Sequence, residues 1–165
     1  MNTSDGITPI SREDIPECVK VIRESFMTVA REFGFTKERS PRFTGHAISD
    51  ERLYYQFDVE KRPMFKYLVG GKTVGYYSLA LPKDGVCELN NLAVLPEFRH
   101  LGIGGKMVAD GLERMKAAGC REAEVCIVEE NKMLRVWYES LGFRHIGIKK
   151  LDGFEFTCGY LRKEI

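Results

Sequence analysis

The feature that most constrains this chain is a strand, a glycine-rich turn, a helix and a second strand that follow one another between residues 86 and 128. Pro96 ends the first strand, because proline cannot donate to a sheet ladder. Apolar residues then recur at helical spacing over 104–118, and a strand pattern follows over 123–128. A helix that joins two strands in this way connects parallel neighbours. The unit therefore predicts a sheet that is at least partly parallel.

The remaining segments complete a mixed sheet. Ser11 can cap a helix whose apolar stripe starts at Ile15. Further strands are expected at 7–10, 65–69, 74–81, 143–149 and 154–161, and further helices at about 50–61 and 131–141. We expect an α/β (mixed α+β) fold: one domain spanning 1–165, with a central, twisted, mixed sheet of about seven strands and helices on both faces.

Composition excludes several classes of function. The net charge is +1 with no basic stripe, which argues against a nucleic-acid partner. No apolar run approaches membrane-spanning length, and the polar start at residues 1–5 lacks the apolar region of a signal peptide. The five cysteines form no Cys-x-x-Cys pair, so we expect reduced thiols and a cytoplasmic location. His46, His100 and His145 are far apart in sequence, so no metal site is expected.

The glycine-rich turn is a candidate anion site. Residues 99–106 read Arg-His-Leu-Gly-Ile-Gly-Gly-Lys. A helix start of this kind presents unpaired backbone N–H groups and the positive end of the helix dipole, which suit a phosphate. The spacing Arg-x-x-Gly-x-Gly matches neither a Walker loop nor a Rossmann fingerprint. The alternative is a helix start that merely contains glycine.

The strand that feeds this turn changes phase once. Cys87 and Leu89 are apolar at odd positions, whereas Leu92 and Val94 are apolar at even ones. The slip near residues 90–91 predicts a β-bulge, a feature common beside active sites. Alternatively, the two asparagines face solvent on an edge strand.

Three motifs resemble those of the GNAT superfamily of N-acetyltransferases. The 99–104 spacing is similar to that family's pyrophosphate loop, and residues 131–143, which end Tyr-x-x-x-Gly-Phe, resemble its second cofactor segment. Glu88 lies eleven residues before Arg99, the spacing at which many members carry a general base. Leu134 departs from the small alanine that is common there. The resemblance covers 86–146 and implies an acetyl-CoA-binding core at about 86–146, with acceptor-side helices at about 11–62.

The resemblance also implies roles for particular residues. Glu88 would be the general base and Tyr138 the general acid for the leaving thiolate, in a direct attack by the amine. A main-chain N–H near Ala93 or Val94 would hold the oxyanion. The implied contacts to acetyl-CoA or coenzyme A are Leu92, Ala93, Val94, Arg99, His100, Leu101, Gly102, Ile103, Gly104, Gly105, Lys106 and Asn131.

These residue types suit acyl transfer to an amine. The attacking amine must be neutral, and a glutamate can accept its proton directly or through a water. A neutral phenol can protonate the departing thiolate. The alternatives are a surface carboxylate paired with a lysine for Glu88 and a core tyrosine for Tyr138. Two rival functions stay open at this point: a non-catalytic acetyl-CoA-binding sensor and an interaction domain without a nucleotide.

The acceptor is expected to be a primary amine of a small molecule or a peptide. Aromatic residues of the first third can line an apolar slot, and its arginines can bind a carboxylate. Alternatively, these side chains are core residues and solvated charges. The candidates are Phe26, Phe33, Phe35, Phe43, Tyr54, Tyr55, Phe57, Arg31, Arg39, Arg42 and Arg52. Many members of the family are homodimers, but the sequence shows no interface.

Overall fold

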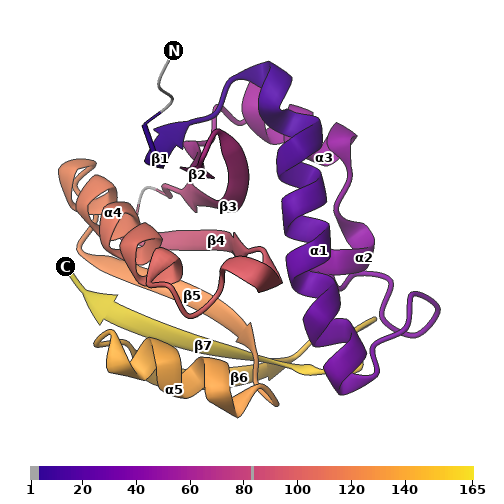
Figure 1. Cartoon of the computed structure of the whole chain (residues 1–165). Coiled ribbons are helices and arrows are strands. Elements are labelled where there is room, and N and C mark those ends of the chain that lie inside the picture. The colour runs from indigo at the N-terminus through magenta and orange to yellow at the C-terminus, as the bar shows by residue number, and fades with distance from the viewer. Residues whose placement is uncertain (1–3, 83) are drawn as a thin grey trace.

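The computed structural model describes residues 4–82 and 84–165 (Figure 1). The beginning of the polar N-terminal stretch considered above, residues 1–3, lies outside the described residues. Among the described residues, no helix combines the length and apolar character needed to cross a membrane.

The first half of the chain lays down one edge of the sheet and the helices that cover it. Ser11 and Asp14 form a capping box around a short 3-10 helix that leads into the first long helix. That helix ends at Gly34 with φ of 73°, a conformation that favours glycine. The elements are β1 (Gly6–Pro9), α1 (Ile15–Phe33), α2 (Thr44–Ala47), α3 (Asp50–Asp58), β2 (Met64–Val69), β3 (Lys72–Ala80) and β4 (Val86–Val94).

The second half supplies the helices beside the glycine turn and the other edge of the sheet. A short 3-10 helix at Pro96–Phe98 separates β4 from the helix that follows. The elements are α4 (Ile103–Ala117), β5 (Glu122–Val128), α5 (Lys132–Ser140), β6 (Arg144–Lys150) and β7 (Thr157–Glu164). The strand expected at 154–161 therefore begins three residues later, and the four-residue helix α2 was not expected.

The seven strands form one mixed sheet in the order β1-β2-β3-β4-β5-β7-β6. Neighbours pair antiparallel except β4 and β5, which are parallel, as the crossover through α4 predicts. Strand β3 is buried on both faces from Thr73 to Leu79, because α1 contacts it and Gly111 of α4 lies against Tyr77 and Leu79. The expected mixed sheet of seven strands with helices on both faces is confirmed (Figure 1).

Apolar side chains form two buried clusters. The larger joins α1, α4 and the central strands, and includes Leu53, Met107 and Leu161, all at most 1% exposed. The smaller joins the end of α1 to the segment before β7 through Ala30, Phe43 and Phe156. The smaller cluster therefore packs the end of α1 against the C-terminal part of the chain.

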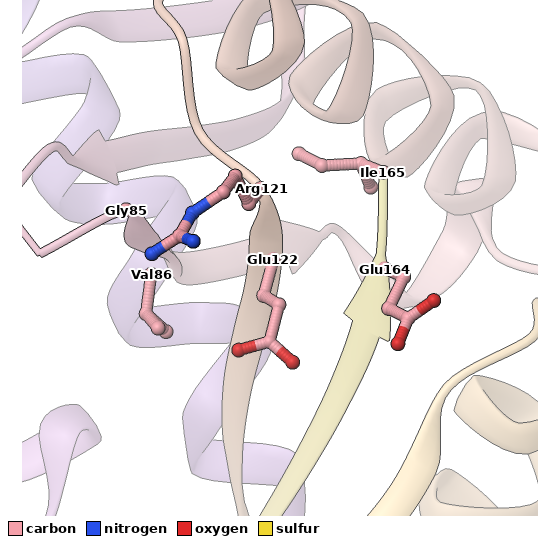
Figure 2. Close-up of a pocket in the computed structure, with 6 residues that line it drawn as sticks. All are labelled: Gly85, Val86, Arg121, Glu122, Glu164 and Ile165. Atoms are coloured by element: carbon pink, nitrogen blue, oxygen red, sulfur yellow. The ribbon is translucent and has the colours of Figure 1, made fainter.

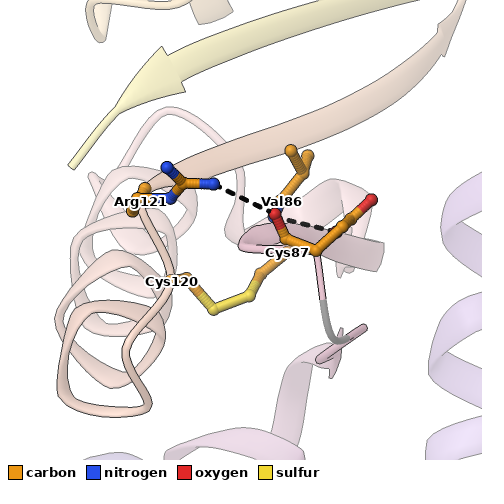
Figure 3. The surroundings of a disulfide bond; sticks show 5 residues. Val86, Cys87, Cys120 and Arg121 are labelled. Carbon is orange, nitrogen blue, oxygen red and sulfur yellow. Dashed lines mark hydrogen bonds between the residues drawn. A yellow bond between two sulfur atoms is a disulfide. The ribbon is translucent and has the colours of Figure 1, made fainter.

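The expectation that all five cysteines are reduced is wrong for two of them. Cys87 of β4 and Cys120, just before β5, form a disulfide with Cα atoms 6.0 Å apart (Figure 3). They meet because β4 and β5 begin side by side, with Cys87 in register with Ala123. Cys18, Cys126 and Cys158 are free.

Candidate functional site

The glycine turn places a helix start at the end of β4. His100 and Gly102 both have positive φ, of 63° and 82°. Gly102 is the N-cap of α4 and, as a glycine, has no side chain that could cap the helix. Ile103 is buried and anchors the turn, whereas Leu101 and Lys106 are exposed. The left-handed backbone at Gly102 therefore turns the chain from the strand into the helix.

The backbone N–H groups from His100 to Gly105 have no acceptor among the described residues. Lys106 is the next residue whose N–H is bonded, to the carbonyl of Gly102 at 3.1 Å. A run of free donors at the positive end of a helix dipole suits an anion. The binding of a phosphate by this loop stays a prediction.

The glycines of the turn do different things. A Cβ on Gly104 would lie 3.2 Å from Cζ2 of Trp137 in α5, so this glycine lets α4 and α5 approach closely. A Cβ on Gly105 would meet nothing within 4 Å. The missing side chain of Gly104 therefore faces Trp137.

The guanidinium of Arg99 points away from this row of donors and towards α1. Its Nε donates to the carbonyl of Val94 at 3.0 Å, its Nη1 to Oγ1 of Thr28 at 3.1 Å and its Nη2 to the carbonyl of Ser25 at 3.0 Å. Burial lowers the pKa of Arg99, and the nearby charge of Glu97 opposes that shift. Nothing in the sequence identified Ser25 and Thr28 as its partners.

Strands β4 and β5 separate next to the turn. They pair only from Val86 to Glu88, although both strands continue for several residues. The predicted bulge is present: the pairing of β3 with β4 shifts by one residue after Asn90, and Asn91 has φ of 54°. Beyond Glu88, the backbone edge of β4 that faces β5 therefore has no strand partner.

Glu88 occupies the last paired position, where the two strands part. Its neighbours Cys87 and Leu89 are buried, and its own side chain is exposed. In the parallel register it lies beside Glu124, whose carboxylate accepts from Arg162 at 2.7 Å. Among the described residues, Glu88 has no ion pair of its own. In the part of the chain that the structure describes, no lysine pairs with Glu88, in contrast to the alternative interpretation.

Helix α5 carries the other two candidates. The side-chain oxygen of Asn131 caps α5 by accepting from the N–H of Leu134 at 3.2 Å, so its amide nitrogen stays available as a donor. Tyr138 is 5% exposed and packs edge-on against Trp137 and Phe143. Burial raises its pKa, which keeps the phenol protonated.

The main-chain candidates for an oxyanion site lie just after the bulge. Ala93 is buried and in register with Tyr76 of β3. Val94 is in register with Gly75, and its carbonyl accepts from Arg99. Both residues belong to the stretch of β4 that has already separated from β5.

The aromatic residues expected on the acceptor side are divided between packing and exposure. Phe43 is buried, and Phe35 packs on it at a ring distance of 5.3 Å. Tyr54 lies under the guanidinium of Arg12, whereas Tyr55 is 56% exposed. Phe26 contacts both buried clusters. Several of the aromatic side chains expected to line an acceptor slot therefore pack against other residues instead.

A surface cavity of about 470 Å³ lies elsewhere on the molecule. Arg121, Glu122, Glu164 and the chain end line it, together with Gly85 and Val86 (Figure 2). These residues lie at the starts of β4 and β5 and at the end of β7, whereas the glycine turn follows the end of β4. The cavity therefore contains none of the candidate site residues. Among the residues that the structure describes, no three metal-ligating side chains gather.

Comparisons with known proteins agree with this geometry. The family model for "Acetyltransferase (GNAT) family" matches residues 28–143, well over half of the chain. The chain is 29% identical over 160 residues to an "Uncharacterized N-acetyltransferase YjgM" of Escherichia coli (strain K12), covering 88% of each protein.

Solved structures share the fold. The PaiA N-acetyltransferase of Thermoplasma acidophilum, in complex with coenzyme A, superposes with a TM-score of 0.79 at 21% identity, covering 99% of this chain and 100% of that one. A phosphinothricin acetyltransferase of Sinorhizobium meliloti, in complex with AcCoA, gives a TM-score of 0.76 at 17% identity, covering 99% of this chain and 89% of that one.

Proposed function

The chain belongs to the GNAT family of acetyltransferases, and from this premise we propose that it transfers the acetyl group of acetyl-CoA to a primary amine of a small molecule or a peptide. We assign the cofactor to a core at about 86–146 and the acceptor to the side formed by helices within about 11–62.

The observation that carries the proposal is the separation of β4 from β5 directly beside a row of free backbone donors. The pantetheine arm of coenzyme A contains amide groups that can pair with an unpartnered strand edge. Its pyrophosphate suits the N–H groups between His100 and Gly105. These two features lie at the two ends of one short segment, so a single elongated ligand can use both.

The proposed cofactor contacts follow from this placement. The backbone of Leu92, Ala93 and Val94 supplies the strand edge, and the Asn131 amide donates to the pantetheine end. Residues 100–106 supply the pyrophosphate site. Arg99 belongs to the same loop through its main chain, because its guanidinium is already bonded to α1 and β4.

The chemistry is a direct transfer. The amine nitrogen forms a bond to the acetyl carbonyl carbon, and the bond from that carbon to sulfur breaks. Glu88 accepts the amine proton, directly or through a water, from its exposed position where the strands part. The Tyr138 hydroxyl gives its proton to the departing thiolate; its raised pKa keeps that proton in place until then.

A non-catalytic acetyl-CoA sensor is the second candidate, and the presence of both Glu88 and Tyr138 argues against it. A cytoplasmic location stays a prediction, and the Cys87–Cys120 disulfide removes one of the observations behind it.

The test is thiol release from acetyl-CoA across a panel of amino acids, short peptides, polyamines, aminoglycosides and aryl amines. We expect turnover with one class, and a loss of about 10²-fold or more in kcat for Glu88→Gln. Tyr138→Phe should lower kcat while the affinity for coenzyme A stays the same. Tyr67→Phe is the matched control, because Tyr67 lies in β2, outside both the acceptor side and the cofactor core. Coenzyme A binding without turnover would favour the sensor, and no binding would refute both candidates.

A further inference from the structure

Arg99 joins three separate parts of the molecule with one side chain. Its acceptors are the last carbonyl of β4 and two oxygens of α1, which lie 71 and 74 residues away in the chain. All three donor–acceptor distances are 3.0 or 3.1 Å. The planar fork of a guanidinium can reach acceptors in different directions at once, which a lysine ammonium on its flexible stem does less well.

The partners of Arg99 are neutral oxygens. Among the described residues it forms no ion pair, and its side chain is part-buried between the strand and the helix. A buried guanidinium that is bonded only to neutral acceptors is costly unless all of its bonds are made. Arg99 therefore ties the position of the loop to that of α1, in addition to the packing of α1 on β4 and on the 3-10 helix Pro96–Phe98.

Helix α1 connects this contact to the acceptor side. It contacts β3, β4, α2 and α3, and its Ala30 belongs to the smaller buried cluster with Phe43 and Phe156. Arg99 holds α1 at Ser25 and Thr28, only one turn before Ala30. The part of α1 that Arg99 contacts and the part that packs in the aromatic cluster are therefore less than two helical turns apart. A change in the order of the loop can affect the cluster through this short stretch of helix.

We propose that Arg99 is a positioning residue that couples occupation of the glycine loop by acetyl-CoA or coenzyme A to the order of α1, and so to the acceptor side. The inference rests on the proposed function, because it needs the ligand at the loop. Coupling between two sites is reciprocal: the ligand at the loop stabilises the second half of α1, and an acceptor that orders α1 tightens the loop's hold on the ligand.

The experiment is hydrogen exchange of the α1 amides, residues 25–33, with and without saturating coenzyme A. Coenzyme A affinity is measured separately by calorimetry on the same samples. In the wild type we expect the ligand to slow exchange in this stretch about fivefold or more. In Arg99→Met the ligand should still bind through the backbone donors, with its effect on α1 lost.

Two further variants separate the possible causes. Arg99→Lys keeps the charge but not the fork, and we expect it to lose the response of α1 as Arg99→Met does. Arg23→Met is the matched control: Arg23 donates from α1 to the carbonyl of Ile48 at 3.0 Å, so this variant also removes a tether of α1, but one that does not reach the loop. Its α1 should still respond to coenzyme A.

The outcomes distinguish this proposal from the function it rests on. If coenzyme A does not bind the wild type, the proposed function itself is refuted. If coenzyme A binds but α1 exchange does not change, or changes equally in Arg99→Met, the coupling role of Arg99 is wrong. Full retention of the response in Arg99→Lys would show that charge alone suffices and would overturn the argument from geometry.

Discussion

Reduction of the Cys87–Cys120 disulfide should destabilise the protein without altering its fold. The bond closes a loop between residues 33 apart in sequence, and in the chain-entropy description a loop of this length stabilises by about 4 kcal/mol at 25 °C. With an m-value of about 2 kcal/mol/M, the urea midpoint should fall by about 2 M. Because Cys87 and Cys120 are both buried, the two thiols remain packed after reduction, and the cross-link alone is lost.

The assay is urea unfolding of the wild type with and without a dithiol reductant, followed by circular dichroism. The variant Cys87→Ala with Cys120→Ala is the control, and its midpoint should not respond to reductant. Thiol titration of the unfolded chain should find three reactive thiols before reduction and five after it. An unchanged wild-type midpoint, or five thiols without reductant, would refute the reasoning.

Two other predictions concern α4 and the start of α1. Gly104→Ala places a Cβ 3.2 Å from the Trp137 ring, whereas the Cβ of Gly105→Ala meets nothing within 4 Å. The free energy of unfolding of Gly104→Ala should therefore be about 1 kcal/mol lower than that of Gly105→Ala. Equal urea midpoints for the two variants would contradict this. Burial favours a higher pKa for Asp14, but its bonds to Lys66 and Ser11 prevail and hold that pKa below its usual 3.8. The contribution of ionised Asp14 to the stability of the fold is therefore present above pH 3.8 and is lost as pH falls through the lowered pKa. Lys66→Met should be less stable than the wild type at neutral pH and equally stable in strong acid. A difference in stability that persisted in acid would argue against this.

Regular segments with a clear apolar period could be predicted from the sequence. The strand that the sequence places between residue 86 and Pro96 is observed at Val86–Val94, because Pro96 ends it and its apolar positions alternate. The change of phase between Leu89 and Leu92 left two alternatives, a bulge and a solvent-facing edge, and the bulge is the one observed. The resemblance to a known family supplied the roles of Glu88 and Tyr138, which periodicity alone does not contain.

Features that depend on distant contacts could not be predicted. Helix α2 has four residues, too few to show a period. The aromatic residues at 154–156 look like a strand, but Phe156 packs on Phe43 instead. The pairing of Cys87 with Cys120 and the bonds from Arg99 to α1 join positions whose proximity appears only once the chain is folded.

The short pairing of β4 with β5 has a mechanical consequence. Strands β1 to β4 form one antiparallel meander, and β5, β7 and β6 form a second antiparallel unit. Only three registered residue pairs join the two, and the Cys87–Cys120 bond lies at the same point. The sheet therefore consists of two antiparallel units that are joined by a short parallel pairing. Bending between these two units should be the collective motion of lowest energy, on a microsecond to millisecond timescale. The disulfide covalently links the two units at the point about which they would bend.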